Sequence, residues 1–160
     1  ILTKRVRIAD YALAKNIAKV NTSGFETDIQ YNKSFHNHQH LFSTLGLVWL
    51  DSKSSDAFPS FYISSHAKFL TNFNIVYLNR WFSISANAIY KSRAAQTASA
   101  ISAALSKDYF LLNARAEAFV LNNKASIFVE SVNVFNQKYS DLLGAPMPGR
   151  WMMAGVKYIL

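Results

Sequence analysis

The feature that most constrains the fold is a ladder of segments in which apolar and polar residues alternate, joined by links that are in turn short and long. Aromatic and β-branched residues alternate with Ser, Thr, Asn and charged residues, the period-two pattern of half-buried strands. We therefore predict an all-β, antiparallel fold. The expected strands are residues 1–9, 17–32, 40–51, 66–78, 81–92, 108–121, 125–136 and 150–160.

The links between these strands differ systematically in length. Short links fall at 34–39, 78–80 and 122–124, and long links at 52–65, 93–107 and 137–149. In an antiparallel meander the two kinds then lie at opposite ends of the sheet. Outer-membrane barrels have tight periplasmic turns and long external loops, whereas soluble sandwiches need not sort their loops in this way. The pattern predicts a transmembrane β-barrel with a periplasmic C-terminus.

The side chains within the strands support this prediction. Phe25, Thr27, Ile29 and Tyr31 share one face of their strand, and residues 82–90 and 110–120 show the same apolar side. The opposite side of 108–121 carries Asn113, Arg115 and Glu117, which could pair in part. Strands 40–51 and 125–136 fit less well, because they place these apolar residues on the polar side: Phe42, Val48, Leu50, Phe128 and Val132.

Aromatic residues are expected at two levels along the strands, because Tyr and Trp favour the boundaries between membrane and water. One set lies at the short-link end and comprises Tyr31, Tyr77, Phe82 and Tyr158. The other set lies at the long-link end and comprises Trp49, Tyr90 and Phe110. Two aromatic girdles are therefore predicted.

Composition excludes several classes of protein. The chain has no Cys, so it has no disulfide framework, and it has no apolar run long enough for a transmembrane helix. The net charge of +8 is scattered and forms no basic stripe, which argues against nucleic-acid binding. The start at Ile1 lacks an initiator Met and a signal-peptide pattern, so we expect a mature chain or a fragment.

One C-terminal motif resembles a known family. Residues 132–139 (VNVFNQKY) and 143–150 (LGAPMPGR) are similar to the end of TonB-dependent outer-membrane receptors. In physical terms an upward strand ends in a polar turn at Asn136, and a loop rich in Gly and Pro cannot continue any strand. The residues that carry the resemblance are Asn133, Phe135, Asn136, Tyr139, Pro146, Pro148, Gly149 and Arg150.

Two further segments resemble the same family. The last strand resembles the C-terminal signal read by the outer-membrane assembly machinery, with Gly155, Tyr158 and Leu160 in matching positions, although Leu160 stands where Phe is more usual. Asn16, Gly24 and Glu26 resemble the strand entry of siderophore and cobalamin receptors. The resemblance implies that Gly24 allows a close backbone approach and that Glu26 is an acidic partner for a plug.

The resemblance also implies the whole architecture. Residues 1–160 would be the C-terminal part of a barrel of about twenty-two strands, and the N-terminal plug would be missing from this chain. The complete protein would lie in the bacterial outer membrane and take up siderophore-bound iron, haem or cobalamin. Its partners would be the lipid bilayer, the assembly machinery, the TonB complex through the missing part, and a metal chelate or corrinoid. Neither a cofactor nor nucleic acid is expected.

Other readings of particular segments remain. His36, His38 and His40 alternate as in some metal sites, but a position in or beside a turn favours ordinary exposed residues, and we predict no metal. The sequence has none of the patterns that indicate an enzyme: a nucleophile with its base, a Gly-rich phosphate-binding loop or paired carboxylates. We therefore do not expect an enzyme. Residues 94–105 have helical propensity, which predicts a short helix in a long surface loop.

Two other classes of protein remain as alternatives. The first is a complete eight-stranded outer-membrane barrel with a structural or adhesive role. The second is a soluble lipocalin-like binding protein, which would place its apolar face inside and leave its outer wall polar.

Overall fold

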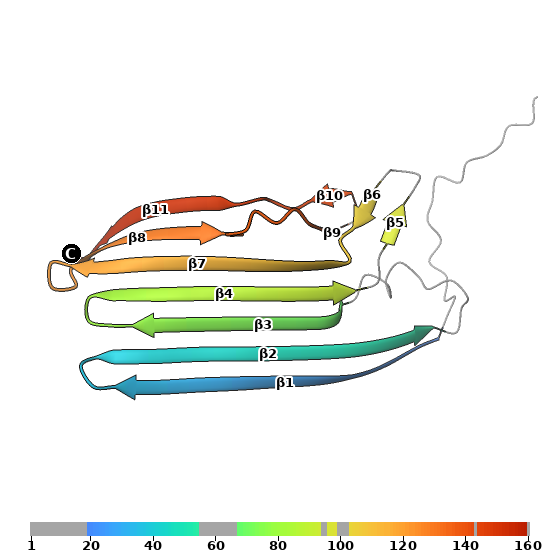
Figure 1. The fold of residues 1–160 in the computed structure, drawn as a ribbon, viewed down its shortest axis with the longest axis horizontal. Helices are drawn as coiled ribbons and strands as arrows, with labels where there is room; N and C mark the ends of the chain where they lie inside the picture. Colours follow the sequence, from blue (N-terminus) through green and yellow to red (C-terminus); the bar gives the residue numbers. More distant parts are fainter. Residues whose placement is uncertain (1–18, 55–66, 94–95, 99–102, 143, 160) are drawn as a thin grey trace, which may run out of the picture.

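The computed structural model describes residues 19–54, 67–93, 96–98, 103–142 and 144–159 (Figure 1). Most of them form one seven-stranded antiparallel sheet, in the order β1-β2-β3-β4-β7-β8-β11. Its strands are β1 (Val20–Phe35), β2 (Gln39–Ser54), β3 (Ala67–Leu78), β4 (Phe82–Arg93), β7 (Asp108–Val120), β8 (Ala125–Val132) and β11 (Trp151–Tyr158). Two small sheets pair β5 (Gln96–Ala98) with β6 (Ala103–Leu105), and β9 (Ser140–Leu142) with β10 (Ala145–Pro146).

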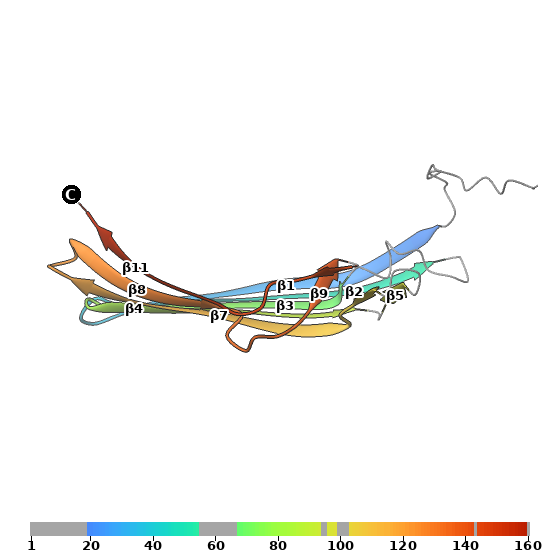
Figure 2. The same ribbon diagram turned by 90° about the horizontal axis from the view of Figure 1, so that it is seen from above.

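The all-β, antiparallel prediction is confirmed, but the described residues form no closed barrel. The seven strands of the sheet correspond to the last seven expected strands, and the expected strand at 1–9 lies outside the described residues. The sheet is open, with β1 and β11 at its edges. Figure 2 shows that it is bowed and twisted, because β1 rises from the central strands at one end and β11 rises at the other.

The links are sorted by length, as predicted. Tight turns at 36–38, 79–81 and 121–124 lie at one end of the sheet, together with the last residue of β11, while the strand ends that the longer links connect lie at the other end (Figure 1). Several turn residues adopt the left-handed conformation, among them Asn37, Asn122 and Asn123, with φ of 62°, 53° and 68°. Asn tolerates this region better than most residues, which explains why polar Asn-rich links make the turns.

Two local predictions were wrong. The strand expected at 125–136 ends at Val132, because Asn133 turns the chain with a φ of 52°, three residues before the predicted turn at Asn136. The short helix expected within 94–105 is replaced, in its described residues, by the pair β5 and β6. Cross-strand pairing overrides the helical propensity of Ala there. No helix among the described residues is long and apolar enough to cross a membrane.

The register of the main sheet separates two faces. The apolar face carries Phe25 opposite Trp49, Trp49 opposite Phe69, Tyr77 opposite Ile84 and Tyr90 opposite Phe110. The polar face carries Asp28, Asn74, Asn87, Asn113, Arg115, Glu117 and Glu130. As expected, Phe42, Val48, Leu50, Phe128 and Val132 also lie on the polar face.

On β4, β7 and β8 the apolar face is the more exposed one. On β7 and β8, Phe110, Val120, Ile127 and Val129 are 38–54% exposed, whereas Asn113, Arg115, Glu117 and Glu130 on the polar face are partly sheltered. Among the described residues the buried apolar set is only Leu105, Tyr109 and Ala125. A single sheet must cover its apolar side with something else, so this face needs a partner or an apolar solvent.

Candidate functional site

A row of hydrogen-bonded amides crosses the polar face. The Nδ2 of Asn74 donates to Thr44 Oγ1 at 3.0 Å, and the Nδ2 of Asn87 donates to Asn74 Oδ1 at 2.6 Å. The Nδ2 of Asn113 donates to Asn87 Oδ1 at 3.3 Å, and Asn113 Oδ1 accepts the backbone N–H of Asn133 at 2.8 Å. These residues, which we call the amide ladder, join β2, β3, β4, β7 and the end of β8. Each Asn side-chain amide both donates and accepts a hydrogen bond, so the row is fully hydrogen-bonded without any charged group.

A charged cluster lies beside the amide ladder. Arg115 pairs with Glu117 at 3.0 Å, as expected from their alternation, and also with Glu130 at 3.1 Å. Its guanidinium covers the ring of Phe128 at 3.9 Å from the centroid. A Cβ at Gly155 would lie 2.7 Å from ring atoms of Phe128, so only Gly fits beneath the ring. This packing accommodates an aromatic ring beside the charged residues of the polar face.

The long-link end holds the most constrained side chain of the described residues. Arg93, at the end of β4, is 2% exposed. Its Nε donates to the carbonyl of Ser106 at 2.8 Å and its Nη2 to the carbonyl of Ser140 at 2.7 Å, while its Nη1 pairs with Asp141 at 2.9 Å. The planar guanidinium therefore fastens two separate loops to the same strand. We call Arg93, Asp141 and their partners the loop clamp.

Asp141 completes the loop clamp from β9. Its Oδ1 also accepts hydrogen bonds from Lys91 at 2.8 Å and from the Tyr109 hydroxyl at 3.1 Å. Burial acts to raise the pKa of the Asp141 carboxyl, but the hydrogen bond and charge of Lys91, together with Tyr109 and Arg93, outweigh it and hold this pKa below its usual range. The carboxylate therefore stays ionised and pairs with both cations.

The C-terminal motif folds back on itself. The Oδ1 of Asn133 accepts the backbone N–H of Gln137 at 2.8 Å, and its Nδ2 donates to the carbonyls of Gln137 and Pro148. The Oδ1 of Asn136 accepts the backbone N–H of Arg150 at 2.9 Å. A Cβ at Gly149 would lie 2.7 Å from this oxygen, which explains the glycine. Asn133 and Asn136 thus join the two halves of the motif.

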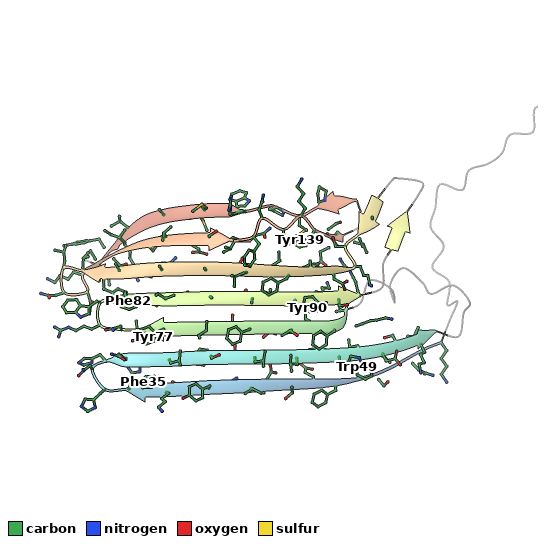
Figure 3. All side chains as sticks on the ribbon, in the orientation of Figure 1. Phe35, Trp49, Tyr77, Phe82, Tyr90 and Tyr139 are labelled. Carbon is green, nitrogen blue, oxygen red and sulfur yellow. The ribbon has the colours of Figure 1, made fainter. Side chains whose placement is uncertain are left out.

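The remaining motif residues have different surroundings. Tyr139 packs on Tyr109, with ring centroids 4.6 Å apart, and its carbonyl accepts the N–H of Met147 at 2.9 Å. Burial and the charge of Asp141 raise the pKa of the Tyr139 hydroxyl. Phe135 is 61% exposed and approaches Phe110 at 6.1 Å. Pro146 belongs to β10, which pairs with β9. Figure 3 shows Tyr139 near the long-link end, beyond β7.

The other predicted residues are not part of this assembly. Gly24 and Glu26 share the polar face of β1, at the opposite edge of the sheet from β11. A Cβ at Gly24 would lie 2.5 Å from the Trp49 carbonyl oxygen, so a close backbone approach is present there. Gly155 and Tyr158 lie in β11, on different faces. Asn16 and Leu160 lie outside the described residues.

The histidines do not converge. Residues 36–38 form the turn between β1 and β2, and His40 lies in β2, where its Nδ1 is 2.9 Å from Ser34 Oγ. In the part of the chain that the structure describes, no group of three His, Asp or Glu residues is placed to hold a metal ion.

Sequence reasoning missed the loop clamp entirely. Arg93, Ser106 and Asp141 come from three segments that are far apart in the chain, and no local spacing links them. The available signal was weak: Arg93 follows Lys91 at one loop end and Asp141 follows Lys138 in another loop, and no spacing links the two pairs.

Comparison of the sequence with protein-family models, curated proteins and solved structures finds no match.

Proposed function

We propose that this chain is a portion of a bacterial outer-membrane β-barrel, of the TonB-dependent receptor kind, and that its apolar face contacts lipid. The observation that carries the proposal is the distribution of side chains between the two faces. Most of the large apolar residues that are exposed on the main sheet lie on one face, although Phe42, Trp151 and Met153 are exposed on the other. The amides and charges form networks on that other face. Barrels in membranes have this arrangement, with an apolar outside and a polar lumen. A lipocalin-like binder has the reverse.

The aromatic residues support the same arrangement. On the apolar face, the ring centroids of Phe82 and Tyr77 lie 5.8 Å apart and those of Phe69 and Tyr90 lie 6.2 Å apart. Figure 3 places Tyr77 and Phe82 toward one end of the sheet and Tyr90 toward the other. The span from Phe82 to Tyr90 is close to the roughly nine to eleven residues that a tilted transmembrane strand needs. Two rows at this separation fit the two boundaries of a bilayer.

In this proposal the short turns face the periplasm and the long links face the outside. The loop clamp then gives the external loops a fixed arrangement, which a receptor needs if loops are to capture a ligand. The resemblance of the Asn133 to Arg150 segment is the reason for proposing TonB-driven uptake of siderophore-bound iron, haem or cobalamin. The role of the chain is transport, not catalysis.

One pair of substitutions tests the membrane assignment. Ile29 and Gln30 are neighbours on β1 and point to opposite faces, and Ile29 is 55% exposed. Ile29→Arg should destabilise the protein in lipid vesicles by about 2–4 kcal/mol, the cost of a cation on the lipid face of a barrel near mid-depth. Gln30→Arg should change stability by less than about 0.5 kcal/mol. Equal stability of the two variants would contradict a lipid-facing apolar side.

A second experiment tests the transport role. A strain that lacks the gene should lose uptake of one of three labelled ligands, siderophore-bound iron, haem or cobalamin, and should regain it when the complete gene is restored. Uptake should also stop when the proton-motive force is dissipated. Unchanged uptake of all three ligands would overturn the receptor assignment but would leave the membrane assignment intact.

A further inference from the structure

A basic hollow lies on the polar face at the short-turn end, far from the loop clamp. It has a volume of about 620 Å³, within the range of small-molecule sites. Its lining comes from β2, β3, β7, β8 and β11 and from the turns at 36–38, 79–81 and 121–124, and it includes His38 and His40. The backbone N–H of Ile159 donates to the Lys124 carbonyl at 2.9 Å, which holds the end of β11 against the second turn.

The charge of the hollow is unbalanced. Three cations line it, Arg80, Lys124 and Lys157, against one carboxylate, that of Glu117. Both oxygens of Glu117 are already engaged, Oε2 by Arg115 at 3.0 Å and Oε1 by the Ser126 hydroxyl at 2.5 Å. Within the described part of the chain, none of the three lining cations forms an ion pair. Lys157 only influences Glu117 electrostatically from a greater distance.

The same hollow has an apolar component. Leu78, Phe119 and Ile159 line it beside the cations. Arg80 is held over the ring of Trp81, 5.0 Å from its centroid, which limits the positions of its guanidinium. Unpaired cations above an apolar floor are complementary to a molecule with an anionic head and an apolar body, since each part finds a matching surface.

We propose that this hollow binds a soluble amphiphilic organic anion, with a phosphate or carboxylate head directed at Lys124 and Lys157 and an apolar body on Phe119. A membrane lipid is the less suitable occupant, because the hollow lies on the polar face and the exposed apolar residues lie on the other. The proposal goes beyond the transport role: the site lies at the end of the sheet opposite the ligand-capturing loops.

The test uses the complete protein that contains this chain, in neutral detergent micelles, and isothermal titration calorimetry, with protein-free micelles as the blank. The probes are 1-naphthyl phosphate, 1-naphthol and inorganic phosphate. We expect 1-naphthyl phosphate to bind more tightly than either 1-naphthol or inorganic phosphate. The double variant Lys124→Gln/Lys157→Gln should bind it about tenfold more weakly, through loss of two charge-assisted contacts.

A matched control removes the same charge elsewhere. Lys53 and Lys138 are exposed residues outside the hollow, and Lys53→Gln/Lys138→Gln should leave the affinity within about twofold. Three results would each overturn the proposal: no binding of the ester, equal binding of 1-naphthol, or equal losses in the two double variants. A change in gel mobility on heating, like that of the unsubstituted protein, would confirm that both double variants are folded.

Discussion

The Nδ2 atom of Asn87 donates a hydrogen bond of 2.6 Å to the Oδ1 atom of Asn74, and the two residues lie directly opposite each other on β4 and β3. Asn87 also accepts from Asn113, so it is an inner member of the amide ladder. Asn87→Leu should destabilise the protein by about 1–3 kcal/mol, because it leaves amide groups of both neighbours unpaired. Urea titration in micelles measures this.

The control for that substitution is Ser85→Ala, two residues earlier on the same face of β4. The change removes a small polar group that is not part of the amide ladder, and its effect should stay below about 0.5 kcal/mol. If the two variants were equally stable, the ladder would contribute nothing measurable.

Gly155→Ala tests the packing beneath Phe128. The added Cβ would lie 2.7 Å from the ring, so the ring must shift from its present position under the Arg115 guanidinium. We expect a loss of about 1–3 kcal/mol from this overpacking. In a Phe128→Ala background the same substitution should have almost no effect, and a double-mutant cycle measures the difference. A cost that persists without the ring would point to the backbone of β11 instead.

Arg93→Lys tests the loop clamp. Lysine keeps the charge but cannot donate in the fixed planar geometry that reaches Ser106, Ser140 and Asp141 together. We expect a loss of about 1–3 kcal/mol and faster proteolysis at the long-link end. Arg150→Lys, at an exposed position, is the matched control and should behave as the unsubstituted chain does. Identical cleavage rates in both variants would contradict the clamp.

The loop clamp should also depend on pH through Asp141. The pKa of its carboxyl in the folded protein lies below the usual value of 3.8, so the folded state binds fewer protons than the unfolded state. The stabilisation is therefore complete above pH values near 3.8 and is lost as pH falls through the lower folded-state pKa. Between about pH 5 and pH 8 this contribution should be constant.

Hydrogen exchange can follow this loss. The amide of Ser106 donates to the Ser140 carbonyl and the amide of Ser140 to the Ser106 hydroxyl, so their protection reports the closed clamp. Protection should fall on acidification in the unsubstituted chain, whereas Asp141→Asn should show low protection at every pH. Unchanged protection of the unsubstituted chain at low pH would show that Asp141 does not hold the loops.

The sequence predicted features that are set locally. The alternation of apolar and polar residues determines which side chains share a face. Asn-rich turns determine where the chain reverses direction, between Phe35 and Gln39 and between Val120 and Ala125. The loop clamp could not be predicted in this way, because Arg93 and Asp141 meet only after the sheet has formed. The role of Asn133 was also hidden, since its side chain closes a turn whose other half lies at Pro148.

The unequal lengths of the strands have a geometric consequence. β1 and β2 have 16 residues each, against 12 in β3 and β4, and their added residues extend past the long-link end (Figure 1). Four further residues add about 13 Å of height to that side. A hydrogen bond of 2.9 Å joins the hydroxyls of Thr22 and Ser52 there. In the proposed barrel, standing upright in the bilayer, the rim would slope, because the side formed by β1 and β2 would stand higher than the side formed by β3 and β4.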